Sequence, residues 1–423
     1  MCLRLLAVPG LKCASSKINS MVLAACNTLA SSSKTRLAFV RDAAGQPDAA
    51  TRPIHRAMGA CLGSGVAGLD AHATDEPPRE QESYLSSLAC SLAPSLVEQH
   101  FVRTAVQALA RPPRRAYGRD ALGPSRTGRE GLIVTREDVV LTNRRGLRIH
   151  ASFWSTAKTW AKTGATYLEP RPAIVYIHGA GSSRAEAADA PLSVACAIGA
   201  SLLAVDTTAQ GRSDGDVGSL GGDYEIADVA ACVDWLRKEA KIEHILLWGR
   251  SAGAVACLGY AREAEMNDAL VRGVVADSAF ANLSAACEGL FERRAPALPR
   301  AFRRRVLDAA FVEVKRVAGW DPRERRVDEV CKKLAMTPVL FAGAHEDDLV
   351  PVKHAETLHA ATRRGELVLF PGTHNSPRPV QALNSFRSFA RRRLMAGSAF
   401  ARRAFGDVSN SSLRIATYSP ATP

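Results

Sequence analysis

A serine stands between two glycines in the pattern Gly-x-Ser-x-Gly at residues 249–253, directly after a short apolar run. A serine hydroxyl becomes a nucleophile when a histidine takes its proton. Between a strand and a helix, this pattern holds the hydroxyl clear of the sheet edge. Gly249 and Gly253 suit such a turn because the neighbouring backbones come too close for a Cβ atom. The pattern also arises by chance, so Ser251 is either a nucleophile or a serine that caps a helix.

A candidate acid and a candidate base follow Ser251 along the chain. Asp347 and His374 each come in a loop directly after an apolar run, and Glu346 and Asp348 flank the first of them as alternatives. A histidine can take the serine proton, and an aspartate can fix the histidine tautomer. The order serine, acid, histidine is the one that α/β-hydrolases use. Together these residues favour Ser251 as the nucleophile.

The elements that must position these residues can be read from the apolar pattern. Strands are expected at residues 173–177, 202–205, 245–248, 271–276, 339–342 and 367–370, and helices at 185–198, 225–239 and after Ser251. Such alternation predicts an α/β fold with a mostly parallel central sheet flanked by helices, and a hairpin at residues 138–153 predicts an antiparallel edge. Ligands of such sheets bind at the carboxyl ends of the strands, where the three residues lie.

Two other readings of the loops after these strands receive less support. Gly179 and Gly181 could begin a dinucleotide-binding fingerprint, but Arg184 stands where its third glycine should be. Asp206 and Ser213 could also take part in the chemistry, but they lie in a polar stretch that is typical of a turn.

About two thirds of the chain, from residue 107 to residue 393, resembles the serine aminopeptidase-like α/β-hydrolases of plants and protists. The resemblance lies in the stretches RPPRRAY, LTNRRGLRIHASFW, YIHGAG, GRSDGDVGSLG, LLWGRSAGAV, VVADSAF, EDDLVPVKHAETLH and GTHNSPRP. It implies an α/β-hydrolase fold with Ser251 as nucleophile, Asp347 as acid and His374 as base. Family members usually carry a bulky residue and a glycine where this chain has Ala252 and Ala209.

The expected activity is that of a serine hydrolase acting on a small-molecule or lipid ester, or on an amide, through an acyl-enzyme. The backbone amides of Ala180 and Ala252 would form the oxyanion hole. No cofactor is implied, because the base activates the nucleophile. A thioesterase, peptidase or acyltransferase would use the same residues, and a non-catalytic binding protein on this fold is the alternative of another class.

Composition narrows the remaining possibilities. The net charge is +13, but the basic residues lie in scattered clusters rather than in one stripe, which argues against nucleic-acid binding. The ten cysteines show no metal-binding spacing and no disulfide framework, and they favour a reducing, intracellular compartment. No run of 18 apolar residues indicates a membrane-spanning helix.

The chain is expected to comprise three parts. Residues 1–80 are predicted to be a disordered or targeting extension, residues 81–400 the hydrolase domain, and residues 401–423 a flexible tail. Residues 1–41 hold six Lys or Arg and no acid, so residues 1–40 are either a transit peptide to an organelle or an extension of a cytoplasmic protein.

A helical lid is expected at residues 279–335. This segment has six arginines and no acid at residues 293–305, followed by an apolar stripe at helical spacing. The stripe consists of Val306, Leu307, Ala310, Phe311, Val314 and Val317. Either the segment contacts an anionic membrane surface, or the stripe packs in the core and the arginines are solvated.

Overall fold

The computed structural model describes residues 79–129, 132–157, 171–265 and 270–395. The expectations for residues 1–40 and 401–423 lie outside the described residues, as does nearly all of the extension predicted at residues 1–80. The described residues form two compact units. The main unit holds residues 106–296 and 311–395, and the helical unit holds residues 79–105 and 297–310.

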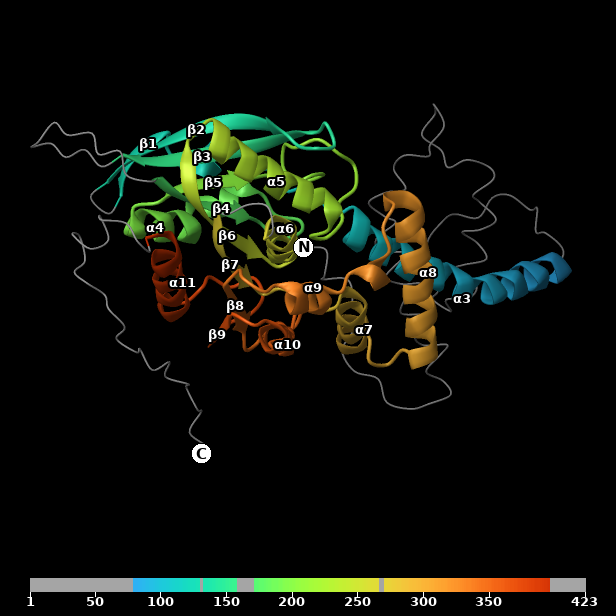
Figure 1. Cartoon of the computed structure of the whole chain (residues 1–423). Coiled ribbons are helices and arrows are strands. Elements are labelled where there is room, and N and C mark those ends of the chain that lie inside the picture. The colour runs from blue at the N-terminus through green and yellow to red at the C-terminus, as the bar shows by residue number, and fades with distance from the viewer. Residues whose placement is uncertain (1–78, 130–131, 158–170, 266–269, 396–423) are drawn as a thin grey trace, which may run out of the picture. The chain divides into compact units, whose positions relative to one another are not determined.

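The described strands of the main unit form one nine-stranded sheet in the order β1-β2-β3-β5-β4-β6-β7-β8-β9 (Figure 1). The antiparallel edge comprises β1 (Arg126–Arg129), β2 (Leu132–Thr142) and β3 (Arg148–Ala157). The parallel strands are β4 (Arg171–Ile177), β5 (Ser201–Val205), β6 (Ile242–Arg250), β7 (Val271–Asp277), β8 (Val339–Ala344) and β9 (Gly365–Phe370). This arrangement confirms the predicted fold class, and β1 extends the predicted hairpin by one strand.

The central strands are apolar because helices cover both faces of the sheet. All five residues of β5 are buried, as are all six of β8. On one face lie α4 (Ala190–Ile198) and α11 (Val380–Leu394), and on the other α5 (Asp223–Lys238), α6 (Ala252–Ala264), α9 (Val327–Lys333) and α10 (Lys353–Ala361) (Figure 1). On the first face the rings of Trp248 and Phe386 meet edge to face, with centroids 5.1 Å apart.

The helix predicted at residues 185–198 forms two elements. A short 3₁₀ helix, η4 (Arg184–Ala188), ends at Ala188, and after Asp189 α4 begins at Ala190 with Pro191 in its first turn. Proline is well tolerated there because the first helical amides need no intrahelical acceptor. Pro191 therefore fixes a new helix start that the apolar pattern alone does not reveal.

The segment predicted as a helical insertion is helical. It contains α7 (Leu283–Arg294), α8 (Arg300–Ala318), the 3₁₀ helix η5 (Pro322–Glu324) and α9. Five of the six residues of the apolar stripe are buried, and Val317 is half-buried. In the helical unit, α3 (Arg79–Ala110) contributes Glu98 to an ion pair with Arg305.

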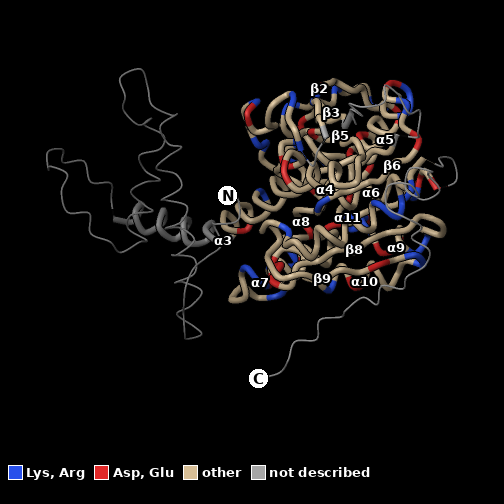
Figure 2. The backbone as a smooth tube through the Cα atoms, turned by 90° about the vertical axis from the view of Figure 1, so that its left-hand side faces the viewer, with Lys and Arg blue, Asp and Glu red and all other residues tan. Residues whose placement is uncertain are grey.

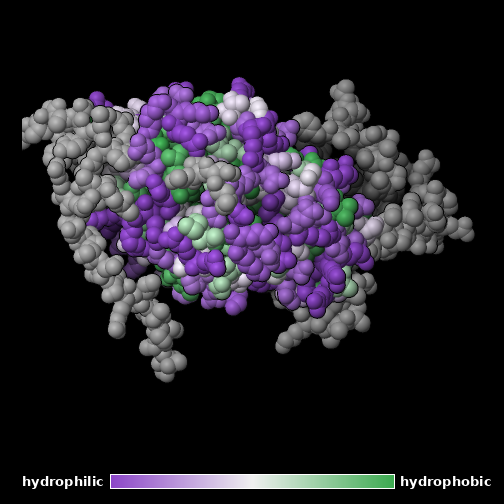
Figure 3. Space-filling view, in the orientation of Figure 1, coloured by the Kyte–Doolittle hydropathy of each residue, from purple (hydrophilic) through white to green (hydrophobic). Residues whose placement is uncertain are grey.

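The surface of the main unit is polar and carries both signs of charge. Lys and Arg are interspersed with Asp and Glu along its backbone (Figure 2). On the face seen in Figure 3, hydrophobic residues lie in small groups among hydrophilic ones. Among the described helices, none combines the length and apolar character that crossing a bilayer requires.

Candidate active site

Ser251 lies at the turn between β6 and α6. Its φ of 53° and ψ of −120° place an L residue in a strained backbone conformation. Its amide donates a hydrogen bond of 2.7 Å to the carbonyl oxygen of Asp277, the last residue of β7. Strained residues persist only where the surrounding structure fixes them, and they cluster at functional sites. The two strands and the helix therefore hold Ser251 at the carboxyl edge of the sheet.

The glycines that flank Ser251 lie where no side chain would fit. A Cβ atom at Gly249 would lie 2.2 Å from the carbonyl oxygen of Gly253. A Cβ atom at Gly253 would lie 2.2 Å from the carbonyl oxygen of Ile177, at the end of β4. Both obstacles are backbone atoms, which cannot swing aside as a side chain could. Glycine at these two positions lets α6 begin directly against β4 and β6.

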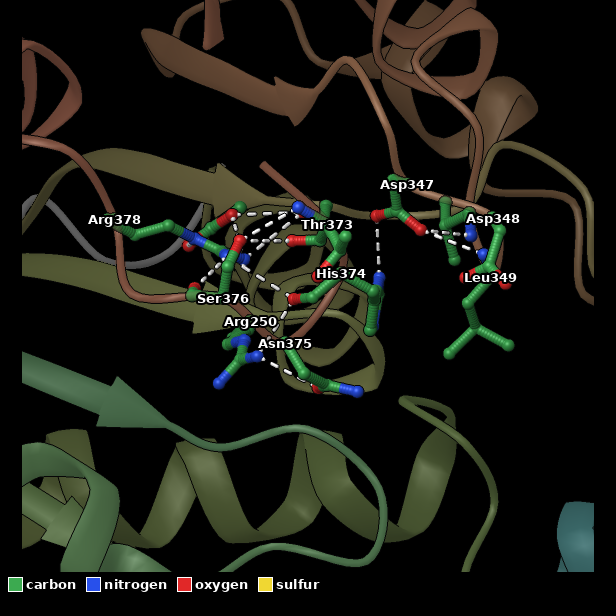
Figure 4. Close-up of polar contacts among 12 residues, drawn as sticks. Arg250, Asp347, Asp348, Leu349, Thr373, His374, Asn375, Ser376 and Arg378 are labelled. Carbon is green, nitrogen blue, oxygen red and sulfur yellow. Dashed lines mark hydrogen bonds and ion pairs between the residues drawn. The ribbon is translucent and has the colours of Figure 1, made fainter. Parts of the chain in front are cut away.

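Asp347 and His374 meet in the loops after β8 and β9. Both are buried, and His374 Nδ1 lies 2.7 Å from Asp347 Oδ2 (Figure 4). Asp347 Oδ1 accepts hydrogen bonds from the amides of Leu349 at 2.9 Å and Val350 at 2.7 Å. A carboxylate at Asp347 makes Nδ1 the donor of this pair, so that Nε2 keeps the lone pair that a base needs.

The acidic neighbours of Asp347 are engaged elsewhere. Glu346 accepts a hydrogen bond from the amide of Gly372, and Asp348 forms an ion pair with Arg294. Of the three consecutive acids, Asp347 is thus the one that the fold brings to His374.

Ser251 and His374 are connected through the residue before the serine. In the described part of the chain, no hydrogen bond joins the Ser251 hydroxyl to His374. Instead, Arg250 Nη2 donates to the main-chain carbonyl of His374 at 2.8 Å and to Asn375 Oδ1 at 3.0 Å (Figure 4). The end of β6 therefore holds the loop that carries the candidate base.

A second guanidinium group holds the same loop. Arg378 Nη1 donates to the carbonyl oxygens of His374 at 3.2 Å and Ser376 at 2.9 Å. Its other nitrogens form a bidentate pair with the buried Asp277, with Nε–Oδ2 at 2.8 Å and Nη2–Oδ1 at 2.9 Å. Because the Asp277 carbonyl accepts the Ser251 amide, one residue anchors both the serine turn and the histidine loop.

Arg250 is held in turn by Glu186, in the η4 segment after β4. The two side chains form an ion pair, and the Tyr176 hydroxyl donates to Glu186 Oε1 at 3.0 Å. Burial alone would raise the pKa of Glu186, but the Arg250 guanidinium and a hydrogen bond from Ser182 hold it below its usual range. Glu186 is therefore a carboxylate that fixes the position of Arg250.

The loop after β4 runs beside Ser251. A Cβ atom at Gly179 would lie 3.3 Å from the Cβ atom of Ser251. The ring of His178 fixes this loop, because its Nδ1 contacts the Gly179 carbonyl at 2.7 Å and its Nε2 accepts from the Thr207 amide at 3.2 Å. Ala180, in this loop, and Ala252, at the start of α6, line the same small pocket.

Asp206 and Ser213 serve the turn that follows β5. Asp206 accepts hydrogen bonds from the amides of Arg184 at 2.8 Å and Arg212 at 3.0 Å, and from the Tyr117 hydroxyl at 2.6 Å. The Ser213 hydroxyl donates to the Asp206 carbonyl at 2.5 Å. The polar groups of Asp206 and Ser213 are thus engaged in hydrogen bonds that stabilise this turn.

Among the described residues, no three His, Cys, Asp or Glu side chains lie close enough to hold a metal ion. The described cysteines are free thiols, four of them buried.

The sequence reasoning missed Arg250, Glu186, Asp277 and Arg378. Arg250 could have been noticed because it directly precedes the candidate nucleophile. Its partners Glu186 and His374 lie 64 and 124 residues away, so no local pattern indicates them.

Comparison with known proteins supports the fold. Residues 172–319 match the family model of the alpha/beta hydrolase fold. No curated protein matches the chain. With the strand order given above, this match shows that the chain has an α/β-hydrolase fold.

Several solved structures are similar to the chain at low identity. The Pyrococcus furiosus esterase Pf2001 is 22% identical over 68% of this chain and 98% of its own, with a TM-score of 0.48. Est1E from Butyrivibrio proteoclasticus, solved with ferulic acid, is 17% identical over 60% of this chain and 97% of its own, with a TM-score of 0.42. A puromycin-hydrolyzing peptidase of Mycobacterium tuberculosis is 16% identical over 62% of this chain and 39% of its own, with a TM-score of 0.44.

Proposed function

We propose that the protein is a serine hydrolase that cleaves an ester or amide bond through an acyl-enzyme. The observation that carries the proposal is the buried Asp347–His374 hydrogen bond, in a loop that Arg250 ties to the strained Ser251. The resemblance to serine aminopeptidase-like α/β-hydrolases supports the same roles.

In the first half of the reaction, Ser251 Oγ attacks the carbonyl carbon while His374 Nε2 takes the hydroxyl proton. The new Oγ–C bond turns the carbonyl oxygen into an oxyanion, which the backbone amides of Ala180 and Ala252 stabilise. The bond to the leaving group then breaks, and His374 gives its proton to the departing alcohol or amine.

In the second half, a water molecule attacks the acyl-enzyme. His374 takes one water proton, and the water oxygen bonds to the acyl carbon. The Oγ–C bond breaks, the carboxylic acid leaves, and His374 returns the proton to Ser251. Asp347 holds the ring in its tautomer and stabilises the imidazolium in both halves.

Labelling with a fluorophosphonate probe tests the proposal. We expect the purified protein to be labelled and to hydrolyse short phenyl esters, and Ser251→Ala to lose both properties, with kcat lower by roughly 10⁶-fold. Ser388→Ala, an exposed serine of α11, is the control and should keep both. A folded Ser251→Ala protein as active as wild type would overturn the assignment.

A thioesterase, peptidase or acyltransferase would be labelled in the same way. Parallel assays with matched ester, thioester and anilide substrates, with and without an added alcohol acceptor, separate these activities. A folded wild-type protein that is neither labelled nor active would instead favour a binding protein on this fold.

A further inference from the structure

A small pocket opens beside the start of α6. Its enclosed part is narrow, with a free volume of about 20 Å³, and its mouth opens to solvent. Ala180 and Ala252 line it, and so do the apolar side chains of Leu109 and Leu220. Since the amides of these two alanines are the proposed oxyanion donors, the acyl group of a bound substrate would have its carbonyl at this pocket.

Gln210 lines the same pocket and carries a buried acceptor without a partner. The residue is 3% exposed. Its Nε2 lies 3.4 Å from the carbonyl oxygen of Pro112, and only the amide nitrogen can donate to that oxygen. The orientation of the amide is thereby fixed, and Oε1 accepts no hydrogen bond from any described residue. A buried acceptor in this state is costly unless a ligand or water donates to it.

Two other polar side chains that line this pocket are occupied. Both ring nitrogens of His178 make hydrogen bonds within the fold. The Glu225 carboxylate accepts from the amides of Ser219 and Gly221 and from the Ser219 hydroxyl. Among the side chains that line this pocket, Gln210 Oε1 is the buried acceptor that lacks a partner within the described residues.

We infer that Gln210 selects substrates whose acyl group carries a hydrogen-bond donor, a hydroxyl or an amide N–H, one or two bonds from the carbonyl. This inference rests on the proposed function. A substrate with a methylene in place of the donor leaves Oε1 unpaired, and sites built around a hydrogen bond discriminate strongly against such analogues.

Two pairs of phenyl esters test this preference because each pair differs only in the donor. Hydroxyacetate is compared with propionate, where a hydroxyl replaces a methyl group. N-acetylglycinate is compared with 4-oxopentanoate, where an N–H replaces a methylene. The measured quantity is the ratio of kcat/KM for donor and isostere, divided by the ratio of their hydroxide-catalysed rates.

We expect this corrected ratio to be roughly 10 in wild type. It should fall to about 1 in Gln210→Met, which keeps the side-chain volume but removes the acceptor. Gln381→Met, an exposed glutamine of α11, is the matched control and should keep the wild-type ratio. An equal ratio in wild type and Gln210→Met overturns the inference.

If Gln210→Met fails to fold, the wild-type ratio alone decides, and a corrected value near 1 overturns the inference. Different results would overturn the proposed function and the role of Gln210. A wild-type protein that is not labelled by the fluorophosphonate and hydrolyses no ester defeats the hydrolase proposal. Labelling at Ser251 without a preference for the donor esters, or without hydrolysis of any of the four, defeats the role of Gln210 only.

Discussion

The guanidinium group of Arg250 donates to the main-chain carbonyl of His374 across 2.8 Å, although the two residues are 124 positions apart in the sequence. Arg250 is the last residue of β6, and Ser251 follows it. The backbone that carries the candidate nucleophile therefore also holds the loop of the candidate base. The ion pair with Glu186 keeps the guanidinium in this position. Alignment of the serine with the histidine thus depends on a side chain that takes no part in proton transfer.

Arg250→Met should lower kcat more than it raises KM. The variant removes a contact that positions His374 and leaves Glu186 without its cation, so we also expect it to destabilise the fold by roughly 1–3 kcal/mol. Steady-state kinetics on a short ester, with thermal unfolding in parallel, measures both effects. We expect kcat to fall about 10- to 100-fold.

Arg387→Met in α11 is the control for loss of an arginine and should change neither quantity appreciably. Arg250→Lys should recover part of kcat, because lysine keeps the charge but not the fork of donors. An Arg250→Met protein with wild-type kcat would show that the His374 loop needs no such support.

The strain at Ser251 predicts a difference in stability between two inactive variants. Its φ of 53° suits glycine better than any L residue. Ser251→Gly should therefore unfold with a free energy about 1 kcal/mol higher than that of Ser251→Ala, after allowance for the greater freedom of glycine in the unfolded chain. Both variants lack the nucleophile and should be inactive.

Urea unfolding at a single pH measures the free energies of unfolding of the two variants. Gly249→Ala and Gly253→Ala, at positions where a Cβ atom meets backbone, should be strongly destabilised in the same assay. Equal free energies for Ser251→Gly and Ser251→Ala would mean that the turn carries no strain.

The sheet could be predicted from the sequence because its order follows from local patterns. Apolar runs that alternate with amphipathic stretches indicate buried parallel strands, and each expected strand appears within a few residues of its predicted place. Once the strands are placed, Ser251, Asp347 and His374 are seen to follow directly after three of them. A parallel sheet gathers its carboxyl ends at one edge.

The contacts that hold the site residues in position could not be predicted, because they join segments that are distant in the sequence. The pairing of Arg378 with Asp277 spans 101 residues and follows no periodicity. The unpartnered oxygen of Gln210 depends on where the Pro112 carbonyl lies, which only the fold determines. The start of α4 depends on how Pro191 fits a helical turn rather than on hydrophobicity.

Stability should depend on pH through Asp228 in α5. Burial raises the pKa of this carboxyl group to about 7, despite hydrogen bonds from Thr208 and Asn143. Because the folded pKa lies above the unfolded one, folding takes up a proton between about pH 4 and 7. The contribution of Asp228 to stability is therefore greatest in acid and falls as pH rises to 7, by at most about 1.4 kcal/mol per pH unit.

Unfolding of wild type and Asp228→Asn in urea at pH 5, 6, 7 and 8 isolates this contribution. The free energy of wild type minus that of the variant should decrease from pH 5 to 7 and then level off. Asp234→Asn, an exposed aspartate of the same helix, controls for the loss of a carboxyl group. A difference that is constant or that grows with pH would contradict the raised pKa.

The basic segment at residues 293–305 leads to a last prediction, about membranes. The apolar stripe that follows the segment is largely buried, so insertion of that stripe into a bilayer would require the fold to open. Arg304 is exposed, and the Arg305 side chain is 64% exposed while it pairs with Glu98. Any contact with an anionic surface should therefore be electrostatic. Sedimentation with phosphatidylserine vesicles should occur at about 20 mM salt and disappear at about 150 mM, because salt screens exposed charges.

Replacement of Arg303, Arg304 and Arg305 by Gln should abolish the low-salt binding to phosphatidylserine. The same change at Arg391, Arg392 and Arg393 removes equal charge from α11, so it separates the effect of this segment from that of net charge. Sedimentation with neutral vesicles, or binding that survives at about 150 mM salt, would mean that the apolar stripe inserts after all. If phosphatidylserine vesicles are not preferred even at low salt, the arginines are ordinary surface charge, because an electrostatic contact would be strongest there.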